Sequence, residues 1–437
     1  MRAGRILLAL LFGIGFFGVL VNGAALYSRF LYISLLLGTI SWLWTQRSAS
    51  GLNLQRSSRV LRANVGDVFE ERYEVSNDSR IPVPWIEVLN QSTLPFAAGS
   101  RLFTFVLGRH RRSYLGRTWL TRRGGFQLGP TRISSGDPFG LFNVSKVIEQ
   151  RETLIVFPVV HEIRSFSSPP GLLPGGQVIR RKAYEITPHA AGVREYVHGD
   201  AMKRIHWPTS ARRNQLMVKE FEQDPQAEIW FYLDSQKAVH FEKPYQQEEL
   251  PPDSMMFVKR PKFKLPPSTL EYSVSITASL AHYFIGQRRS VGYVSAGQTF
   301  TVHPAERSER QEVKILETLA FVEANGSFSI AALVAAQSSQ LPQGSGVFLV
   351  TPTVRPDILQ AVDDLQMRYL RPVVVLLNTE TFGGPRGTAA LVNSLRERRV
   401  SVTVLQYGDD LSQSLSEIPL NFKTQDIRPW QTPVFSQ

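Results

Sequence analysis

The hydrophobic positions change their pattern along the chain, and the first pattern is two nearly unbroken apolar runs. The first run, Ile6–Leu26, is long enough for a helix to cross a hydrocarbon core of about 30 Å at about 1.5 Å per residue. The second, Phe30–Trp44, spans if its helix begins near Ala24. The sequence therefore predicts a transmembrane helical hairpin over residues 1–47, with its turn around Gly23–Arg29.

Basic residues flank this hairpin where it begins and where it ends. Arg2 and Arg5 precede it, and four more arginines follow it: Arg47, Arg56, Arg59 and Arg62. The positive-inside rule then predicts a multi-pass protein of the inner (plasma) membrane with its soluble domains in the cytoplasm. A cleaved signal peptide is the alternative, because Val21-Asn22-Gly23 resembles a cleavage region. The second apolar run favours the hairpin.

Gly13, Gly15 and Gly18 match the dinucleotide-binding pattern G-x-G-x-x-G. They lie inside the first apolar run instead of between a strand and a helix, and no acidic residue precedes Asp67 to hold a ribose. We interpret these glycines as positions at which two membrane helices approach each other closely.

After the hairpin, polar and apolar residues alternate in short runs. The runs are rich in β-branched or aromatic residues and predict strands at Phe69–Val75, Trp85–Leu89, Leu102–Leu107 and Thr153–Phe157. Loop clusters and a type I turn at Asp137-Pro138-Phe139-Gly140 separate them. Strands without intervening amphipathic helices predict a β-sandwich domain over residues 52–160.

A linker over residues 161–190, rich in Pro, Gly and Ser at 167–176, precedes a third pattern in which apolar strands alternate with helices. We predict a doubly wound, Rossmann-like α/β domain over residues 191–420, with a mobile insertion at 240–267 and a tail at 421–437. Its predicted strands are Ile229–Leu233, Ser290–Val294, Gly346–Val350, Val373–Leu377 and Ser401–Leu405, and its predicted helices are Thr269–Tyr283, Arg310–Val322, Pro356–Met367 and Ala389–Arg398.

Composition narrows the function classes. The 437 residues include no cysteine, which excludes disulfides, cysteine-ligated metal sites and a cysteine nucleophile. The 49 Lys and Arg exceed the 37 Asp and Glu, for a net charge of +12. This excess indicates contact with nucleic acid, an anionic membrane surface or an acidic protein without choosing among them.

The most distinctive stretch follows the linker. Asp200 is a plausible N-cap of a short helix that carries Met202 and Ile205 and ends before Pro208. We expect Trp207 to anchor this stretch to the core. Thr209 or Ser210 restarts a turn, and Leu216–Phe221 is expected to run as a strand into the α/β sheet.

This stretch resembles the signature of a bacterial family catalogued as domain of unknown function 58. The matching positions, which we take as the family signature and a possible interface, are Arg194, Glu195, Tyr196, Gly199, Asp200, Lys203, Ile205, Trp207, Ser210, Ala211 and Arg212. Lys203 stands where the family usually has arginine. Two further motifs resemble the family's, Arg123-Gly124-Gly125-Phe126 to Gly129-Pro130 and Asp137-Pro138-Phe139-Gly140-Leu141-Phe142.

The resemblance implies a membrane hairpin, a β-domain and a von Willebrand A-like α/β domain that engages an AAA+ ATPase of the MoxR type or its clients. It implies no enzymatic activity and no cofactor. Von Willebrand A domains often hold a metal at D-x-S-x-S, but Asp234-Ser235-Gln236-Lys237-Ala238 lacks both later serines, and Thr351-Pro352-Thr353 has no aspartate. We expect no metal.

Two other function classes stay open. Basic residues such as Arg180–Lys182 make a polyanion-binding membrane module the alternative, with nucleic acid or anionic lipid as its ligand. Nucleic acid is not expected, because acidic residues are interleaved with these basic ones and no RNA-binding signature accompanies them. A hydrolase would need Asp200, His206 and Ser210 to converge in an exposed cluster. His198 and His206 beside Lys203 are poorly placed to bind a cation.

Overall fold

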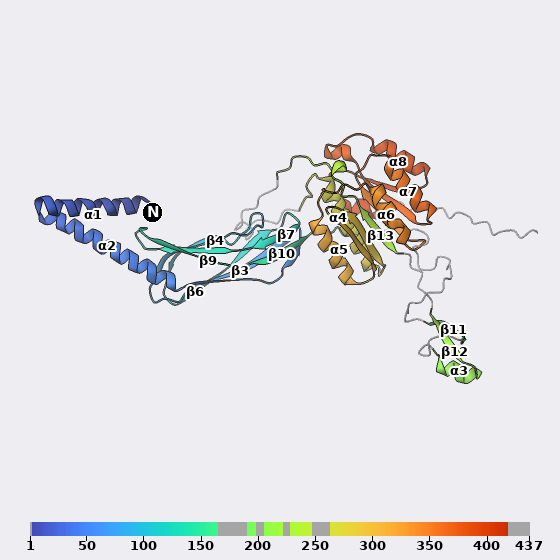
Figure 1. Ribbon diagram of the computed structural model, residues 1–437, viewed down its shortest axis with the longest axis horizontal. Helices are drawn as coiled ribbons and strands as arrows, with labels where there is room; N and C mark the ends of the chain where they lie inside the picture. Colours follow the sequence, from blue (N-terminus) through green and yellow to red (C-terminus); the bar gives the residue numbers. More distant parts are fainter. Residues whose placement is uncertain (1, 165–189, 198–204, 222–227, 247–262, 418–437) are drawn as a thin grey trace, which may run out of the picture. The chain divides into compact units, whose positions relative to one another are not determined.

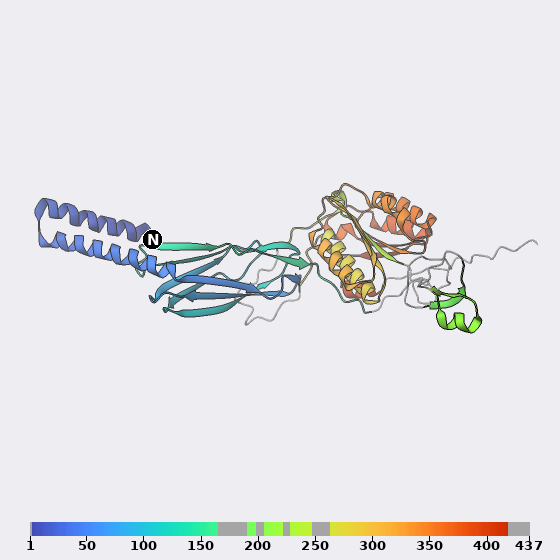
Figure 2. The same ribbon diagram turned by 60° about the horizontal axis from the view of Figure 1, so that its bottom comes forward.

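The computed structural model describes residues 2–164, 190–197, 205–221, 228–246 and 263–417 (Figures 1 and 2). The chain forms two compact units. The first comprises Met1–Val160, Pro244–Pro267 and Val313–Val322, and the second comprises His161–Lys243, Ser268–Glu312 and Glu323–Gln437.

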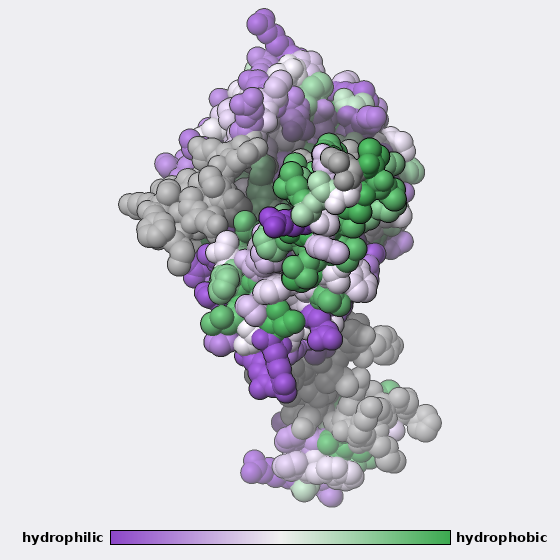
Figure 3. All heavy atoms as spheres, turned by 90° about the vertical axis from the view of Figure 1, so that its left-hand side faces the viewer, coloured by the Kyte–Doolittle hydropathy of each residue, from purple (hydrophilic) through white to green (hydrophobic). Residues whose placement is uncertain are grey.

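The first unit begins with two antiparallel helices, α1 (Arg2–Asn22) and α2 (Ala25–Ser50). Both are long and apolar enough to cross a membrane, and seen from the hairpin side their surface is largely hydrophobic (Figure 3). A Cβ atom on Gly15 would lie 2.7 Å from the backbone nitrogen of Leu31, and one on Gly18 would overlap the Tyr27 ring. Gly15 and Gly18 therefore permit close helix approach, as the sequence predicts, whereas a Cβ on Gly13 would meet no atom within 4 Å, so the prediction is wrong for Gly13.

Ten strands follow α2 in the first unit, and they include all four strands predicted from the alternating pattern. Their pairing orders are β1-β3-β6, β2-β10-β7 and β5-β4-β8-β9, with β2 and β10 parallel and the remaining pairs antiparallel. The strands are β1 (Leu52–Ser58), β2 (Arg62–Asn64), β3 (Val68–Asn77), β4 (Val83–Asn90), β5 (Arg101–Val106), β6 (His110–Trp119), β7 (Gly124–Leu128), β8 (Thr131–Gly136), β9 (Asn143–Ile148) and β10 (Glu152–Phe157).

The interior of this β-domain holds an ion pair among apolar side chains. Arg56 lies 3.7 Å from Glu71, and both side chains are nearly inaccessible to solvent. Tyr73 and Val75 are fully buried on the same strand as Glu71. Burial raises the pKa of Glu71, and the charge of Arg56 opposes that rise. Removal of either partner would leave a buried charge without compensation.

In the second unit, β11 (Ala190–Glu195) pairs antiparallel with β12 (Met217–Phe221) in a sheet of their own, with the short helix α3 (Trp207–Arg213) preceding β12. The strand expected at Leu216–Phe221 is therefore present. The expectation that it runs into the α/β sheet is wrong, because its backbone groups pair with β11 instead of with a strand of the larger sheet.

A six-stranded sheet of order β15-β14-β13-β16-β17-β18 forms the centre of the α/β part, parallel except for the edge strand β15. The predicted mixed α/β fold with a mostly parallel sheet is confirmed. The strands are β13 (Ile229–Leu233), β14 (Val291–Ala296), β15 (Phe300–Glu306), β16 (Gly346–Thr351), β17 (Arg371–Leu377) and β18 (Ser401–Leu405).

The helices of the α/β part lie in the connections between these strands, except α9, which follows β18. The sequence pattern predicted four of them and missed α6, α9 and the strand β15. The helices are α4 (Thr269–Gly286), α5 (Glu309–Phe321), α6 (Ile330–Gln337), α7 (Asp357–Met367), α8 (Thr388–Glu397) and α9 (Leu411–Ser416), with single 3-10 turns η2 (Lys237–Val239), η4 (Ser338–Gln340) and η5 (Thr379–Phe382).

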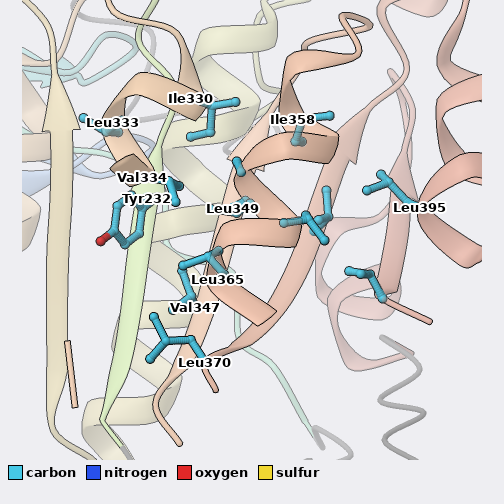
Figure 4. Close-up of a cluster of buried hydrophobic side chains, with 14 of the residues drawn as sticks. Tyr232, Ile330, Leu333, Val334, Val347, Leu349, Ile358, Leu365, Leu370 and Leu395 are labelled. Atoms are coloured by element: carbon cyan, nitrogen blue, oxygen red, sulfur yellow. The ribbon is translucent and has the colours of Figure 1, made fainter. Parts of the chain in front are cut away.

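Both faces of the sheet are covered. Side chains of α6, α7 and α8 pack with Tyr232, Val347 and Leu349 on one face (Figure 4). On the other face, the rings of Phe231 and Phe348 pack with Phe284 of α4. Coverage on both faces explains why these strands are continuously apolar in the sequence.

The first and last residues of the predicted insertion at 240–267 are held in place. The Phe241 N–H donates a hydrogen bond to Thr269 Oγ1 at 2.9 Å, and Glu242 forms a β-bridge with Ser268. The Phe263 ring lies 6.1 Å from the Trp119 ring within the first unit. The rest of the insertion (247–262), most of the predicted linker (165–189) and the predicted tail lie outside the described residues.

Candidate functional site

Two places hold the residues that the sequence singles out. The first is the signature unit, which we define as β11, α3 and β12 with residues 196–197, 205–206 and 214–216. The second is the sheet edge, defined as the last residues of β13 and β16 and the residues that directly follow them. Both are built by short segments whose hydrogen bonds can be traced individually.

Helix α3 begins differently from the sequence prediction. His206 is its N-cap, and the His206 Nδ1 accepts a hydrogen bond from the Thr209 N–H at 3.3 Å. Pro208 lies in the first helical turn, where its missing N–H costs nothing. The prediction that Pro208 ends a helix is therefore wrong, because proline is tolerated at a helix start. Ile205 is not helical but forms a β-bridge with Val218.

Ser210 fastens α3 to β12. Its side chain is buried, and its Oγ accepts a hydrogen bond from the Met217 N–H at 2.9 Å and lies 3.0 Å from the His206 carbonyl oxygen, to which it can donate. The hydroxyl is thus fully engaged with backbone groups. This arrangement argues against Ser210 as a nucleophile, because a nucleophile must face its substrate and a general base.

The Trp207 side chain is exposed, whereas the sequence predicts that it is buried. Its side chain is 65% exposed, so the expectation that it anchors the segment to the core is wrong. The buried positions Ile205, Ser210 and Met217 hold the segment together instead. A tryptophan freed from a packing role is available to contact another molecule.

The signature unit contains further exposed residues besides Trp207. Ala211 is one turn further along α3, and Arg212, Arg213, Val197 and Leu216 are also exposed. Tryptophan and arginine are the residue types that contribute most to protein interfaces, where they lie together with apolar neighbours. The exposed part of the signature unit therefore has the composition of a protein contact.

The other signature residues divide between described and undescribed positions. Arg194 and Glu195 lie on β11, and Tyr196 follows it with its N–H donating to the Leu216 carbonyl oxygen at 2.8 Å. Gly199, Asp200 and Lys203 lie outside the described residues, as do His198 and Arg180–Lys182.

The sheet edge lies where the strand order changes direction. The chain passes from β13 to its neighbour β14 and later returns to β16 on the other side of β13. In open α/β sheets, ligands bind in the crevice at such a switch point, outside the carboxyl ends of the strands. Asp234 directly follows β13, and Thr351 is the last residue of β16.

Hydrogen bonds within the chain occupy the Asp234 carboxylate. Thr351 Oγ1 donates to Asp234 Oδ2 at 2.6 Å, and the Gln236 N–H donates to Asp234 Oδ1 at 3.0 Å. The Thr353 N–H in turn donates to Thr351 Oγ1 at 3.0 Å. Asp234 is only 2% exposed. Its carboxylate thus joins the ends of two neighbouring strands.

Burial raises the pKa of Asp234 to about 6. The negative charge of Asp357 adds to the increase, whereas the two hydrogen bonds and the positive charge of Arg355 oppose it. The carboxylate is therefore less stable here than in water although both of its oxygens are hydrogen-bonded.

The sheet edge offers few ligands for a divalent ion. Among the described residues there is no group of three or more His, Asp or Glu side chains that could hold a metal. At the position of the expected metal motif, both oxygens of Asp234 already accept hydrogen bonds, and the following residues fold into η2. The donor set does not fit a metal ion. The sequence missed the Asp234–Thr351 pair, which a threonine ending a buried parallel strand could have indicated.

The other two motifs hold the first unit together. Arg123 Nε donates to the Leu319 carbonyl oxygen at 3.0 Å, and its Nη2 donates to that of Val322. Gly129 has φ +79°, and a Cβ there would lie 2.6 Å from Arg56 Nη1. In the last motif, the buried Asp137 carboxylate accepts hydrogen bonds from three backbone N–H groups. These residues therefore shape and fasten loops.

Comparison with known proteins gives one curated relative that matches the sequence. The chain is 25% identical over 202 residues to the uncharacterized protein YeaD of Bacillus subtilis (strain 168). The match covers 45% of this chain and 42% of the relative, so the chain spans less than half of that protein.

Solved structures are similar only distantly. A CARDB domain from Pyrococcus furiosus, solved in complex with di-metal ions, has 12% identity and a TM-score of 0.19 over 24% of this chain and 91% of that domain. A cycloisomaltooligosaccharide glucanotransferase from Paenibacillus sp. has 10% identity and a TM-score of 0.16, covering 81% of this chain and 52% of the other. Scores this low define no fold and carry no argument about function.

The family comparison covers a segment that contains most of the signature unit and the Asp234 part of the sheet edge. Residues 192–250 match the model described as "Protein of unknown function DUF58". This segment holds most of the signature unit together with β13 and Asp234. Over residues 192–250, where the signature residues also lie, the chain is similar to the DUF58 family of proteins of unknown function.

Proposed function

We propose that this protein is a non-enzymatic, membrane-anchored partner or assembly factor whose signature unit engages an AAA+ ATPase of the MoxR type or its clients. The observation that carries the proposal is the 65% exposure of Trp207 on a helix fixed by the buried Ser210. A large aromatic side chain presented on a small, internally bonded scaffold is suited to protein recognition, because little entropy is lost when it is buried.

The absence of enzymatic activity in this proposal is supported by how the polar candidates are used. Ser210 bonds to backbone groups, and Asp234 bonds to Thr351 and Gln236. Neither has its reactive atom free toward solvent. The proposal includes a metal-independent contact for the same reason.

The finer architecture belongs to the proposal as well. We assign the β-domain as a β-sandwich and the α/β part as von Willebrand A-like, supported by the paired sheets and by the parallel order around β13. The hairpin of α1 and α2 would insert into the inner membrane with the remaining chain in the cytoplasm, supported by Arg5 and Arg47 at the same end of the hairpin.

Affinity purification of the full chain from detergent-solubilised membranes tests the partner. We expect an AAA+ ATPase to be recovered with the wild-type chain, with or without added ATP. Trp207→Ala should reduce recovery at least tenfold, because truncation of an aromatic interface residue typically costs 2 kcal/mol or more, about a thirtyfold loss in affinity.

Met367→Ala is the matched control, because Met367 is 73% exposed but lies on α7, outside the signature unit. It should leave recovery unchanged. Failure to recover any AAA+ ATPase under either nucleotide condition would contradict the proposed partner. Equal losses with both variants would contradict the role of the signature unit.

The alternative is a module that binds polyanions such as anionic lipid or nucleic acid. Its support is the exposed pair Arg212 and Arg213 in the last turn of α3. It predicts binding to anionic vesicles or oligonucleotides that weakens steeply with added salt and is lost in the Arg212→Gln/Arg213→Gln variant. Binding that is absent or insensitive to salt would eliminate this alternative.

A further inference from the structure

The loop between β8 and β9, residues 137–142, has a fixed shape. The Asp137 carboxylate is 1% exposed and accepts hydrogen bonds from the N–H groups of Phe139 at 2.9 Å, Leu141 at 3.2 Å and Phe142 at 2.5 Å. Gly140 adopts φ +69° at its tip. Three bonds to one carboxylate, together with backbone bonds between Asp137 and Phe142 and between Gly140 and Asp137, hold the loop in this shape.

The same loop is attached to the start of helix α1. Arg5 Nε donates to the Leu141 carbonyl oxygen at 2.5 Å, and the Arg5 guanidinium lies 5.7 Å from the centre of the Phe142 ring. A Cβ on Gly4 would lie 3.3 Å from Leu141 Cδ2, so the buried Leu141 packs closely on the helix backbone. The loop is thus fixed to α1 by a charge-assisted bond and an apolar contact.

The position of Arg5 along the hairpin gives the depth of this loop. Arg5 and Asn22 are separated by about 26 Å of helix at 1.5 Å per residue, close to the hydrocarbon thickness of about 30 Å. Gly15 lies against Leu31, and Gly38 lies near Leu8, so Arg5 is level with about Ser41 of α2. Arg5 therefore marks the level at which the hydrocarbon ends.

Helix α2 continues well past this level before the β-domain begins. From Ser41 to Ser50 it rises by about 14 Å, whereas the headgroup layer on one side is only about 5 to 8 Å thick. The β-domain, which begins after Ser50, therefore lies mostly beyond the headgroup layer. The loop is an exception, because its bonds to Arg5 return it to the boundary between hydrocarbon and headgroups.

Phe139 projects from the loop at this level. Its side chain is 59% exposed, and it is two residues from the Leu141 carbonyl that Arg5 binds. On α2, Trp42 is 51% exposed and lies near the level of Gly4. Aromatic side chains are enriched at this depth in membrane proteins, because the interface accommodates their rings.

We infer that the loop at residues 137–142 is a second membrane contact, with Phe139 inserted into the lipid interface and Arg5 holding the loop there. The inference rests on the proposed insertion of α1 and α2 into a membrane. A partner protein is a poorer occupant for Phe139, because its attachment to Arg5 places the ring at the depth that lipid itself occupies.

The absence of cysteine from the chain allows a direct test. Three variants of the full chain, Phe139→Cys, Val60→Cys and Ile14→Cys, are each labelled with a nitroxide. They are reconstituted in vesicles of phosphatidylethanolamine and phosphatidylglycerol. Collision rates with lipid-soluble oxygen and with a water-soluble nickel chelate report the depth of each label. Val60 is a matched control, because it is 57% exposed and lies past the far end of β1 from α2.

The label at position 139 should collide preferentially with oxygen. Its ratio of the oxygen collision rate to the nickel-chelate collision rate should be several times that at position 60 and below that at position 14. Adding Arg5→Ala should shift the label at position 139 toward the nickel chelate. If position 14 reports lipid but position 139 matches position 60, the inference is wrong and membrane insertion stands. If position 14 itself reports water, the proposed membrane anchor is wrong, and the inference falls with it.

Discussion

The signature unit and the sheet edge lie close together in the sequence yet use their distinctive residues in opposite ways. In the signature unit the polar Ser210 is buried and the apolar Trp207 is exposed. At the sheet edge, Asp234 is buried with both carboxylate oxygens hydrogen-bonded, at the position where related folds place ligands. The comparison shows that position in a fold is not enough to make a binding site. The side chains must also be exposed and have hydrogen-bonding groups or apolar surface that the chain itself does not occupy.

The largest expected effect comes from two tryptophans in the matched segment. Trp230 of β13 is 6% exposed, and its Nε1–H donates to Glu228 at 2.8 Å. Trp230→Ala should lower the free energy of unfolding by about 3 to 5 kcal/mol, because it leaves a large cavity. Trp207→Ala should change it by less than about 0.5 kcal/mol. Urea titration of the full chain in detergent measures both, and equal losses would contradict the difference in burial.

The next effect concerns the pH dependence of stability. Because the pKa of Asp234 is raised from 3.8 to about 6 by burial, the folded chain binds this proton more tightly than the unfolded chain. Its contribution to stability is therefore lost as the pH rises from about 4 through 6. The loss is about 3 kcal/mol, at about 1.4 kcal/mol per pKa unit.

Asp234→Asn should remove this part of the pH dependence, measured as the free energy of unfolding between pH 4 and pH 7. Asp363→Asn is the control, because Asp363 forms a partly exposed pair with Arg398. If the slope between pH 4 and pH 6 persists in Asp234→Asn, another group is responsible for it.

A smaller effect is expected at Ser210. Ser210→Ala removes the acceptor of the buried Met217 N–H and should destabilise the signature unit by about 1 to 3 kcal/mol. Faster hydrogen exchange of the Met217 amide would measure this loss locally. Ala211→Ser, at an exposed neighbouring position, should leave the exchange rate unchanged. Unaltered exchange in Ser210→Ala would mean that Ser210 does not fasten α3 to β12.

The smallest effect is expected from divalent ions. Millimolar Mg²⁺ should shift the melting temperature by less than about 1 °C. A ligand stabilises the folded chain only when its concentration reaches its dissociation constant for a site there, and we expect no such site for Mg²⁺. An upward shift that grows with Mg²⁺ concentration and disappears in Asp234→Asn would show that the sheet edge opens to accept an ion.

The sequence pattern predicted the α/β strands well because burial on both faces leaves a strong signal. Ile229–Leu233 and Ser401–Leu405 were predicted with the boundaries that the structure shows. The edge strand β15 was missed because it is half-exposed and follows β14 after a tight turn. Helix α6 was missed because its eight residues are too short and too uniformly apolar to show a helical period.

The errors in the signature unit have a different cause. A proline is compatible with either the end or the first turn of a helix, and only the pairing of Ile205 with Val218 decides between them. A tryptophan is usually well buried, so sequence alone favours a packing role for Trp207. Its 65% exposure is a property of the folded segment that the residue type alone does not indicate.

The junction between α2 and β1 has a mechanical consequence. Gly51 alone separates the helix from the strand. Its carbonyl oxygen accepts a hydrogen bond from the Asp78 N–H at 2.8 Å, and a Cβ there would lie 2.5 Å from the Ser79 nitrogen. A junction without slack transmits a pull or a twist on the β-domain directly to the helix. A force applied to the β-domain would thus tilt the hairpin of α1 and α2.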